Sequence, residues 1–339
     1  MTPWYQDTAS DQGQILSSRV RLARNIKKYR FQQKLTPEDA RLMVQEAQDA
    51  VTRTGARMFH QMDIKVLGET EQKVFIEKHI VSPEFLKGNL PQSLLVSDDQ
   101  NISVMLGEED HIRIQSVQPG DMLAKALEKA NQIDDLIEES VEFAFHPEFG
   151  YLTACPTNTG TGLRASFMIH LPCLERSDGI KKLLPTINRV GITLRGLYGE
   201  GTAPMGSIYQ ISNQTTLGKS EEDIIQGLQF VTNTVIEKEN AAMAKLLSSH
   251  KGDTENTIYR AYGTLAYSRK ITAKESMDML SLVRLGYMAG LLDKPKPTKQ
   301  IYQIMMEIQP GHLMGVARRE MNEAERDTAR ANYLREIFT

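Results

Sequence analysis

Four short strand-like segments that follow one another closely constrain the fold of this sequence more than any other feature. They are bounded by Gly and Pro and cover residues 150–155, 165–171, 191–198 and 207–212. Two parallel strands need a crossover connection of about a dozen residues or more, which is usually a helix. These segments lie too close together for a helix between each pair, so we predict a largely antiparallel sheet flanked by helices, of the α+β class.

A further pair of strands is predicted earlier in the chain. Residues 102–106 and 111–117 alternate between apolar and polar side chains, and the turn Gly-Glu-Glu-Asp at 107–110 separates them. Alternation on both sides of a short turn is typical of a β-hairpin.

Helix signals surround these strands. A helix near 37–53 follows the N-cap residue Thr36, a second begins at Asp121, and a third begins at Ser220. After about residue 240 the sequence contains no convincing strand, and the Pro-Lys-Pro at 295–297 divides the remaining helical pattern. We therefore predict a separate helical C-terminal domain.

Composition excludes several classes of protein. Among 339 residues, 40 Lys+Arg against 43 Asp+Glu give a net charge of -3, which argues against a partner that is nucleic acid. No apolar run reaches the roughly 20 residues of a membrane helix, so no membrane is expected. The first residues lack the basic and apolar regions of a secretory signal, and we place the protein in the cytoplasm.

Arginines in short extended or Gly-flanked segments are the densest chemical signal. They are Arg19 and Arg21 in SSRVRLARN, Arg113 in EEDHIRIQ, Arg164 in GTGLRAS and Arg195 in LRGLYGEG. Any one of them could be an ordinary surface residue. Together they suit a clamp on nucleotide phosphates, because guanidinium groups bind phosphate oxygens bidentately. The sequence contains no P-loop.

Acidic turns and a lone thiol accompany the arginines. Glu108-Glu109-Asp110 and Glu200 lie in turns that contain glycine, and Cys155 begins CPTNTGTGLR. Such turns are often merely solvated, and a free cysteine often only packs in a core. Near several cations, however, a thiolate would be stabilised.

These motifs resemble a known family. CPTNTGTG is similar to the signature of the phosphagen (guanidino) kinases, and SSRVRLARN, EEDHIRIQ, RASFMIHLP, RGLYGEG and YQISNQTTLG resemble its other blocks in the same order. RDTARA at 326–331 resembles the RDxxRA motif of the McsB-type protein arginine kinases. The resemblance implies a catalytic domain at 14–243 and a helical domain with a phosphoarginine-binding motif at 244–339.

The resemblance also implies roles for residues. Glu109 and Glu200 would hold the substrate guanidinium, with Cys155 beside it. Contacts to ATP are implied for Ser17, Ser18, Arg19, Val20, Arg21, His79, Arg113, Arg164, Ala165, Ser166, Phe167, Met168, Arg195, Gly196, Leu197, Tyr198, Gly199 and Glu200. Phosphoarginine contacts are implied for Arg326, Asp327, Arg330 and Ala331. Gly107 stands where the animal enzymes usually carry Asn, which affects the shape of that turn.

The implied reaction is phosphoryl transfer from ATP to arginine in proteins. Two carboxylates would orient one guanidino nitrogen and accept its proton as the N–P bond forms. Mg²⁺ is expected to arrive with ATP, because the sequence offers no dedicated carboxylate cage. The implied partners are protein substrates, an activator protein and a Clp-type protease or chaperone, in a homodimer or higher oligomer that serves protein degradation or stress control.

Two other functions stay open. One is a kinase of free arginine or another small guanidino compound, and the other is a catalytically silent reader of phosphoarginine. Only sixteen residues precede Ser17, so we expect no separate N-terminal domain of the kind that helps to enclose small substrates in the animal enzymes. Both glutamates, the thiol and the five arginines are present, which argues against a silent protein.

Overall fold

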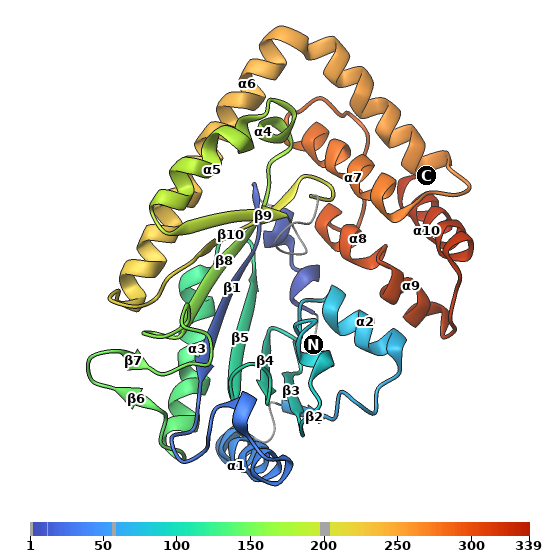
Figure 1. Ribbon diagram of the computed structural model, residues 1–339. Coiled ribbons are helices and arrows are strands. Elements are labelled where there is room, and N and C mark those ends of the chain that lie inside the picture. Colours follow the sequence, from blue (N-terminus) through green and yellow to red (C-terminus); the bar gives the residue numbers. More distant parts are fainter. Residues whose placement is uncertain (1–2, 12, 56–58, 197–203) are drawn as a thin grey trace. The chain divides into compact units, whose positions relative to one another are not determined.

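The computed structural model describes residues 3–11, 13–55, 59–196 and 204–339, and its main feature is an eight-stranded sheet (Figure 1). The strands follow the order β2-β3-β4-β5-β1-β8-β10-β9. Their bounds are β1 Ile15–Arg24, β2 Phe59–Met62, β3 Ser93–Ser97, β4 Ile102–Leu106, β5 Ile112–Pro119, β8 Leu163–His170, β9 Ile192–Gly196 and β10 Ile208–Asn213. A second sheet pairs β6, Phe145–His146, with β7, Gly150–Tyr151. The predicted α+β class and antiparallel sheet are confirmed.

The predicted hairpin is also confirmed. Strands β4 and β5 are antiparallel, with Leu106 opposite Ile112 beside the turn. Gly107 in that turn has φ +80°, a left-handed conformation that glycine and, less often, asparagine adopt. A Cβ at this position would lie 2.8 Å from the carbonyl oxygen of Pro91, so the turn fits glycine better than asparagine.

One predicted strand is mostly wrong. Of residues 150–155, only Gly150–Tyr151 are in a strand, and the chain then turns through residues 154–159. The backbone N–H of Tyr151 donates to the carbonyl of Gly160 at 2.7 Å, which closes this loop. Most of residues 150–155 thus belong to the loop that carries Cys155.

The three predicted helices are present, and two carry the expected caps. Helix α1, Pro37–Gly55, begins after Thr36, whose hydroxyl accepts the N–H of Asp39 at 3.1 Å. The hydroxyl of Ser220 accepts the N–H of Asp223 at 3.0 Å at the start of α6. Helix α6 spans Glu221–Tyr267 and is interrupted at His250, and α3 is Leu123–Glu138, two residues later than predicted. The other helices are α2 Glu69–Glu77, α4 Pro172–Arg176, α5 Gly179–Arg189, α7 Ala273–Met288, α8 Ile301–Glu307, α9 Pro310–Ala317 and α10 Glu323–Phe338.

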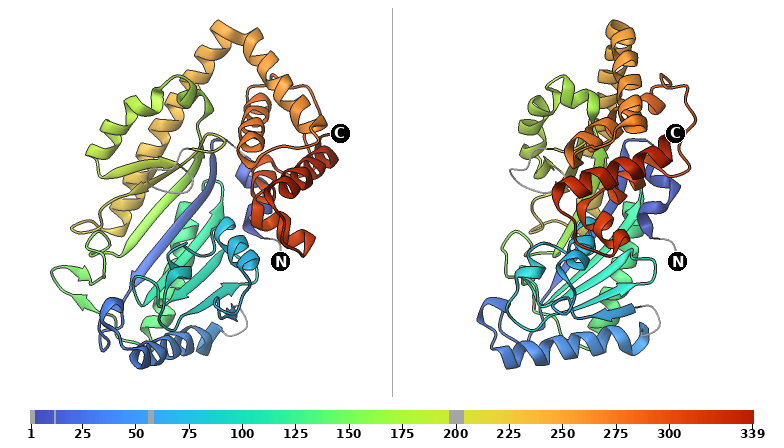
Figure 2. Two further views of the ribbon diagram at one scale, coloured as in Figure 1. Left: turned by 45° about the vertical axis from the view of Figure 1, so that its right-hand side comes forward. Right: turned by 90° about the vertical axis from the view of Figure 1, so that its right-hand side faces the viewer.

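The chain forms two compact units that alternate along the sequence. The first contains residues 1–4, 18–166 and 212–228, and the second contains residues 5–17, 167–211 and 229–339. In the first unit, an apolar cluster around Phe85, Leu94 and Met105 supports strands β3 and β4. The second unit contains α4 to α5 and α7 to α10, which can be followed in both views of Figure 2. After β10 the chain contains helices and loops only, and residues 293–300 around the Pro-Lys-Pro are not helical, as predicted. No helix in the described part of the chain has the length and apolar character needed to cross a membrane.

Candidate active site

Strand β1 presents two arginines on one side. Arg19 and Arg21 are partly exposed, whereas Ser18 and Val20 between and beside them are buried. Successive side chains of a strand point to opposite faces, so this burial pattern places both guanidinium groups on the same face. Two cations on one face suit the phosphate clamp that the sequence predicts.

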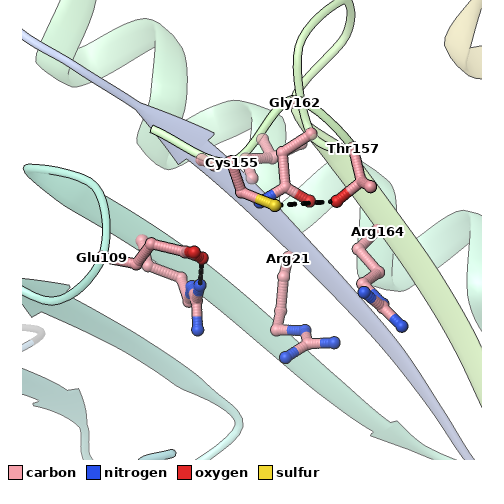
Figure 3. Close-up of a pocket in the computed structure, with 10 residues that line it drawn as sticks. Arg21, Glu109, Cys155, Thr157, Gly162 and Arg164 are labelled. Atoms are coloured by element: carbon pink, nitrogen blue, oxygen red, sulfur yellow. Dashed lines mark hydrogen bonds and ion pairs between the residues drawn. The ribbon is translucent and has the colours of Figure 1, made fainter. Parts of the chain in front are cut away.

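One pocket of the first unit unites residues from three strands, one turn and one loop (Figure 3). It is lined by Arg21 of β1, Arg113 of β5, Arg164 of β8, Glu109 of the turn after β4, and Cys155 of the following loop. In Figure 3 the thiol of Cys155 lies above the guanidinium groups of Arg21 and Arg164, and Glu109 lies to the left of both arginines. Three of the five predicted arginines therefore meet one predicted carboxylate and the predicted thiol.

The pocket carries more positive than negative charge. Burial lowers the pKa of Arg21 well below its ordinary value, and the nearby cations Arg19, Arg113 and Arg164 lower it further, while Glu108 opposes them. The Nε of Arg21 is buried and has no hydrogen-bond partner. A buried guanidinium nitrogen without an acceptor costs free energy, so the pocket is suited to an anionic ligand with several oxygens.

The two glutamates of the turn differ in environment. Glu108 has a side chain only 2% exposed and accepts a hydrogen bond from Arg113 at 2.6 Å and one from Ser82. Glu109 has a side chain 43% exposed and lies 3.4 Å from Arg113. Burial raises the pKa of Glu109, and Arg113 opposes that rise. Glu108 thus fixes the arginine, whereas Glu109 presents a carboxylate to the pocket.

The loop of Cys155 is held by residues that sequence reasoning missed. Asp110 is fully buried and accepts the N–H of Ala154 and the side-chain amide of Asn25, each at 2.7 Å. Asn25 also donates to the carbonyl of Leu152 at 3.0 Å. The Sγ of Cys155 lies 3.0 Å from the hydroxyl of Thr157. The only signal for Asp110 in the sequence was its place in the acidic turn, which did not distinguish a buried carboxylate from a solvated one.

Other predicted phosphate contacts lie at varied positions. Ser18 accepts the N–H of Met122 at 2.9 Å and donates to Gly120, so it holds the start of α3. His79 follows α2 with φ +57°, and burial, with Arg19 nearby, lowers its pKa to about 3. His111 is buried, and its Nδ1 accepts the N–H of Ile26 at 3.0 Å.

The remaining predicted positions contribute little side chain to this pocket. Buried side chains are found at Ser17, Ala165, Ser166, Phe167 and Met168. Arg195 is partly exposed on β9, where Gly196 ends the strand, and both belong to the second unit. Leu197, Tyr198, Gly199 and Glu200 lie outside the described residues.

The RDxxRA segment lies on α10. Arg330 is buried and donates to the carbonyls of Ile308 and Ile271, each at 3.0 Å, and to Asp327 at 2.6 Å. Arg326 is half-buried and donates to the carbonyl of Met321 at 2.7 Å. Ala331 is buried. Arg330 therefore ties α10 to the connection between α6 and α7 and to the turn between α8 and α9, whereas Arg326 and Asp327 are more accessible.

Comparison with known proteins defines the class and then the family. Residues 42–242 match the model described as ATP:guanido phosphotransferase, C-terminal catalytic domain, so the chain is a guanidino phosphotransferase of the phosphagen kinase superfamily. Residues 251–339 match the Protein-arginine kinase McsB C-terminal domain. Protein-arginine kinases from Halalkalibacterium halodurans and Bacillus subtilis are each 41% identical over 99% of this chain, and cover 94% and 93% of their own lengths. The chain belongs to the protein-arginine kinase family.

Solved structures support the fold assignment. The duplicated taurocyamine kinase from Schistosoma mansoni, solved with transition state analogue components, matches with a TM-score of 0.58 and 27% identity over 74% of this chain and 35% of its own. Lombricine kinase matches with a TM-score of 0.60 and 24% identity over 72% of this chain and 70% of its own, which is evidence for the fold alone.

Proposed function

We propose that this chain transfers the γ-phosphoryl group of ATP to the guanidino group of arginine side chains in proteins. The observation that carries the proposal is a single pocket in which three arginines meet a half-exposed carboxylate and a thiol. Cations suit the triphosphate, and the carboxylate suits a guanidinium acceptor. A transfer from ATP to a guanidinium accounts for the arginines and for the carboxylate in one pocket.

The arginines act first on ATP. Arg21, Arg113 and Arg164 neutralise the phosphate oxygens and align the γ-phosphorus, and the partnerless Nε of Arg21 gains an acceptor. Because Glu108 already holds Arg113 at 2.6 Å, this cation is positioned before the nucleotide binds. Charge that spreads over the transferring phosphoryl group is then stabilised with little rearrangement.

Glu109 acts on the acceptor. Its carboxylate binds the arginine guanidinium, orients one nitrogen toward the γ-phosphorus and accepts the proton as the N–P bond forms and the bond to ADP breaks. A carboxylate whose pKa is raised by burial is a better proton acceptor than a solvated one. Cys155 lies beside the guanidinium, and Glu200 is proposed as the second carboxylate.

The pocket residues fit ATP whose phosphates carry the Mg²⁺ ion. Among residues 3–11, 13–55, 59–196 and 204–339, no group of three or more His, Cys, Asp or Glu is placed to hold a metal. The excess of cations and the buried Nε of Arg21 favour a polyanion over a bare metal ion. Bound to the phosphates, Mg²⁺ would neutralise charge on the leaving group.

Further roles are part of the same proposal. Residues 14–243 catalyse transfer and residues 244–339 read phosphoarginine, with Arg326 for the phosphate and Asp327 for the guanidinium. The ATP contacts assigned to the other predicted positions complete the nucleotide site. Cytoplasmic location, an oligomer, an activator protein and a Clp-type protease that removes marked proteins complete the proposal.

A comparison of acceptors tests the proposal and its alternatives. ADP release is measured with an unfolded arginine-containing protein, with the same protein after its arginines are chemically blocked, and with free arginine. We expect turnover with the first acceptor only. Equal turnover with free arginine would identify a small-molecule guanidino kinase, and no turnover with any acceptor would identify a silent reader.

A further inference from the structure

A second cavity in the second unit has a lining rich in cations. It has a volume of about 390 Å³, within the ~300–1,000 Å³ typical of ligand sites, and is formed by the chain around α4 and α5 together with α6. Both views of Figure 2 show α5 running beside α6. We call this cavity the basic groove. Cations, a thiol, an imidazole and an apolar side chain line it, from Cys173, Arg176, Lys182, Lys245, Leu246 and His250.

The cations of the basic groove have no direct polar partner within the described ranges of the protein. In the described part of the chain, the side chains of Arg176, Lys182 and Lys245 make no ion pair or hydrogen bond. They come from α4, α5 and α6, so three separate elements present positive charge to one cavity. Charges of one sign around a hollow raise the local concentration of the opposite charge.

No carboxylate among the described residues lines the basic groove, and the neighbouring acids lie outside it. Asp178 pairs with Lys181 at 2.8 Å, outside the groove lining. Glu239 is 2% exposed, and its two oxygens accept backbone N–H groups at the start of α4, each at 2.8 Å. Glu175 hydrogen-bonds Tyr209. Asp178 attracts Lys182 without a direct contact, and Glu175 keeps one buried oxygen without a hydrogen-bond partner, but neither carboxylate lines the groove.

The floor of the basic groove is apolar. Ala242, Leu246 and the thiol of Cys173 line it, and burial raises the pKa of Cys173 to about 12, so that thiol is neutral. One wall contains His250, where φ -140° interrupts α6. A ligand that matches this lining needs carboxylates at its edges and apolar side chains at its centre.

We propose that the basic groove docks an acidic, amphipathic segment of the protein substrate. The inference rests on the proposed function, because a kinase of protein arginines must hold a polypeptide in addition to one side chain. Charge complementarity selects an acidic peptide, and the apolar floor selects a segment with spaced Leu-like residues over a small inorganic anion. The kinase thereby prefers substrates that carry such a segment away from the target arginine.

Direct binding tests the docking step without catalysis. Fluorescence anisotropy measures binding of a labelled peptide of alternating Glu and Leu, which contains no arginine, to the full chain without ATP. Lys182→Glu with Lys245→Glu should weaken binding about tenfold and reduce its salt dependence. The matched control Lys73→Glu with Lys125→Glu changes two exposed lysines of the first unit and should bind as the wild type.

A kinase assay tests whether the docked segment belongs to the substrate. Two substrates differ only in an appended Glu-Leu segment, and the groove variant should raise KM for the longer substrate while kcat for both stays unchanged. Equal peptide binding by the variant and the control, or an unchanged KM, overturns the inference. Displacement of the peptide by inorganic phosphate alone would also overturn the inference. Loss of self-association in the groove variant, with peptide binding unchanged, would overturn it as well. Groove-dependent peptide binding in a chain that phosphorylates no arginine would instead refute the proposed function.

Discussion

Replacement of Glu109 by Gln separates chemistry from stability. The substitution keeps the size of the side chain but removes the charge that binds a guanidinium and the group that accepts its proton. Loss of a positioned acid–base group costs about 10²–10⁴ in rate. Because Glu108 still holds Arg113 at 2.6 Å when Glu109 is replaced, ATP binding should stay within about twofold of the wild type.

The neighbouring residue provides the matched control. The Glu109 side chain is 43% exposed and 3.4 Å from Arg113, so after solvent screening its loss should change the free energy of unfolding by about 0.5 kcal/mol or less. Glu108 is 2% exposed and 2.6 Å from Arg113. Glu108→Gln leaves a mostly buried guanidinium with only the longer contact to Glu109, which should cost about 2–3 kcal/mol, below the full loss of a buried pair.

Three measurements decide the comparison. Turnover is followed by ADP release, ATP binding by calorimetry, and stability by urea unfolding of each variant. Near-native turnover of Glu109→Gln would refute the carboxylate mechanism. A larger loss of stability in Glu109→Gln than in Glu108→Gln would refute the division of roles between these two residues.

Three further predictions concern reactivity, the tail and pH. Cys155 should be alkylated faster than Cys173, whose pKa of about 12 leaves a thiolate fraction of ~10⁻⁴ at pH 8; peptide mapping with and without ATP and acceptor checks this, and equal labelling would contradict it. Arg326→Ala should abolish phosphoarginine binding to the tail. Asp327→Ala should also abolish it and should lower the stability of the protein, because Asp327 holds the buried Arg330. Undiminished heat in a calorimetric titration of phosphoarginine into either variant would contradict a binding role for the motif. Activity should require the ionised form of Glu109, whose pKa is raised above the ordinary 4.5. Activity should therefore be present above this raised pKa and be lost as the pH falls through it. A coupled assay in which activity does not fall on the acid side until below pH 4.5 would contradict the role of Glu109 as proton acceptor.

The sequence predicted those parts of the fold that depend on local patterns. Alternation and turn chemistry located the hairpin at 102–117, and capping residues located α1 and α6. Residues 150–155 defeated the same reasoning, because a short run of mostly apolar residues in a loop has the same pattern as a short strand. Strands β2 and β3 were missed: only Phe59 of β2 is buried, and the two strands are defined by their pairing with each other.

The candidate site shows a similar division. Residue types that suit phosphate and guanidinium chemistry pointed to Arg21, Arg113, Arg164, Glu109 and Cys155, and the fold brings all five to one pocket. Supporting residues carry no such signal. The burial of Asp110 and the commitment of Glu108 to Arg113 follow from tertiary packing, which composition and spacing do not encode.

Mass spectrometry of an acceptor protein tests the central claim most directly. The chain is incubated with ATP and Mg²⁺ and a generic unfolded protein, and peptides are mapped under conditions that preserve acid-labile phosphate, with Glu109→Gln as the matched enzyme control. We predict phosphate on arginine nitrogens with the wild type and almost none with the variant. Phosphate on Ser, Thr or Tyr, or equal arginine phosphorylation by both enzymes, would contradict a transfer through this pocket.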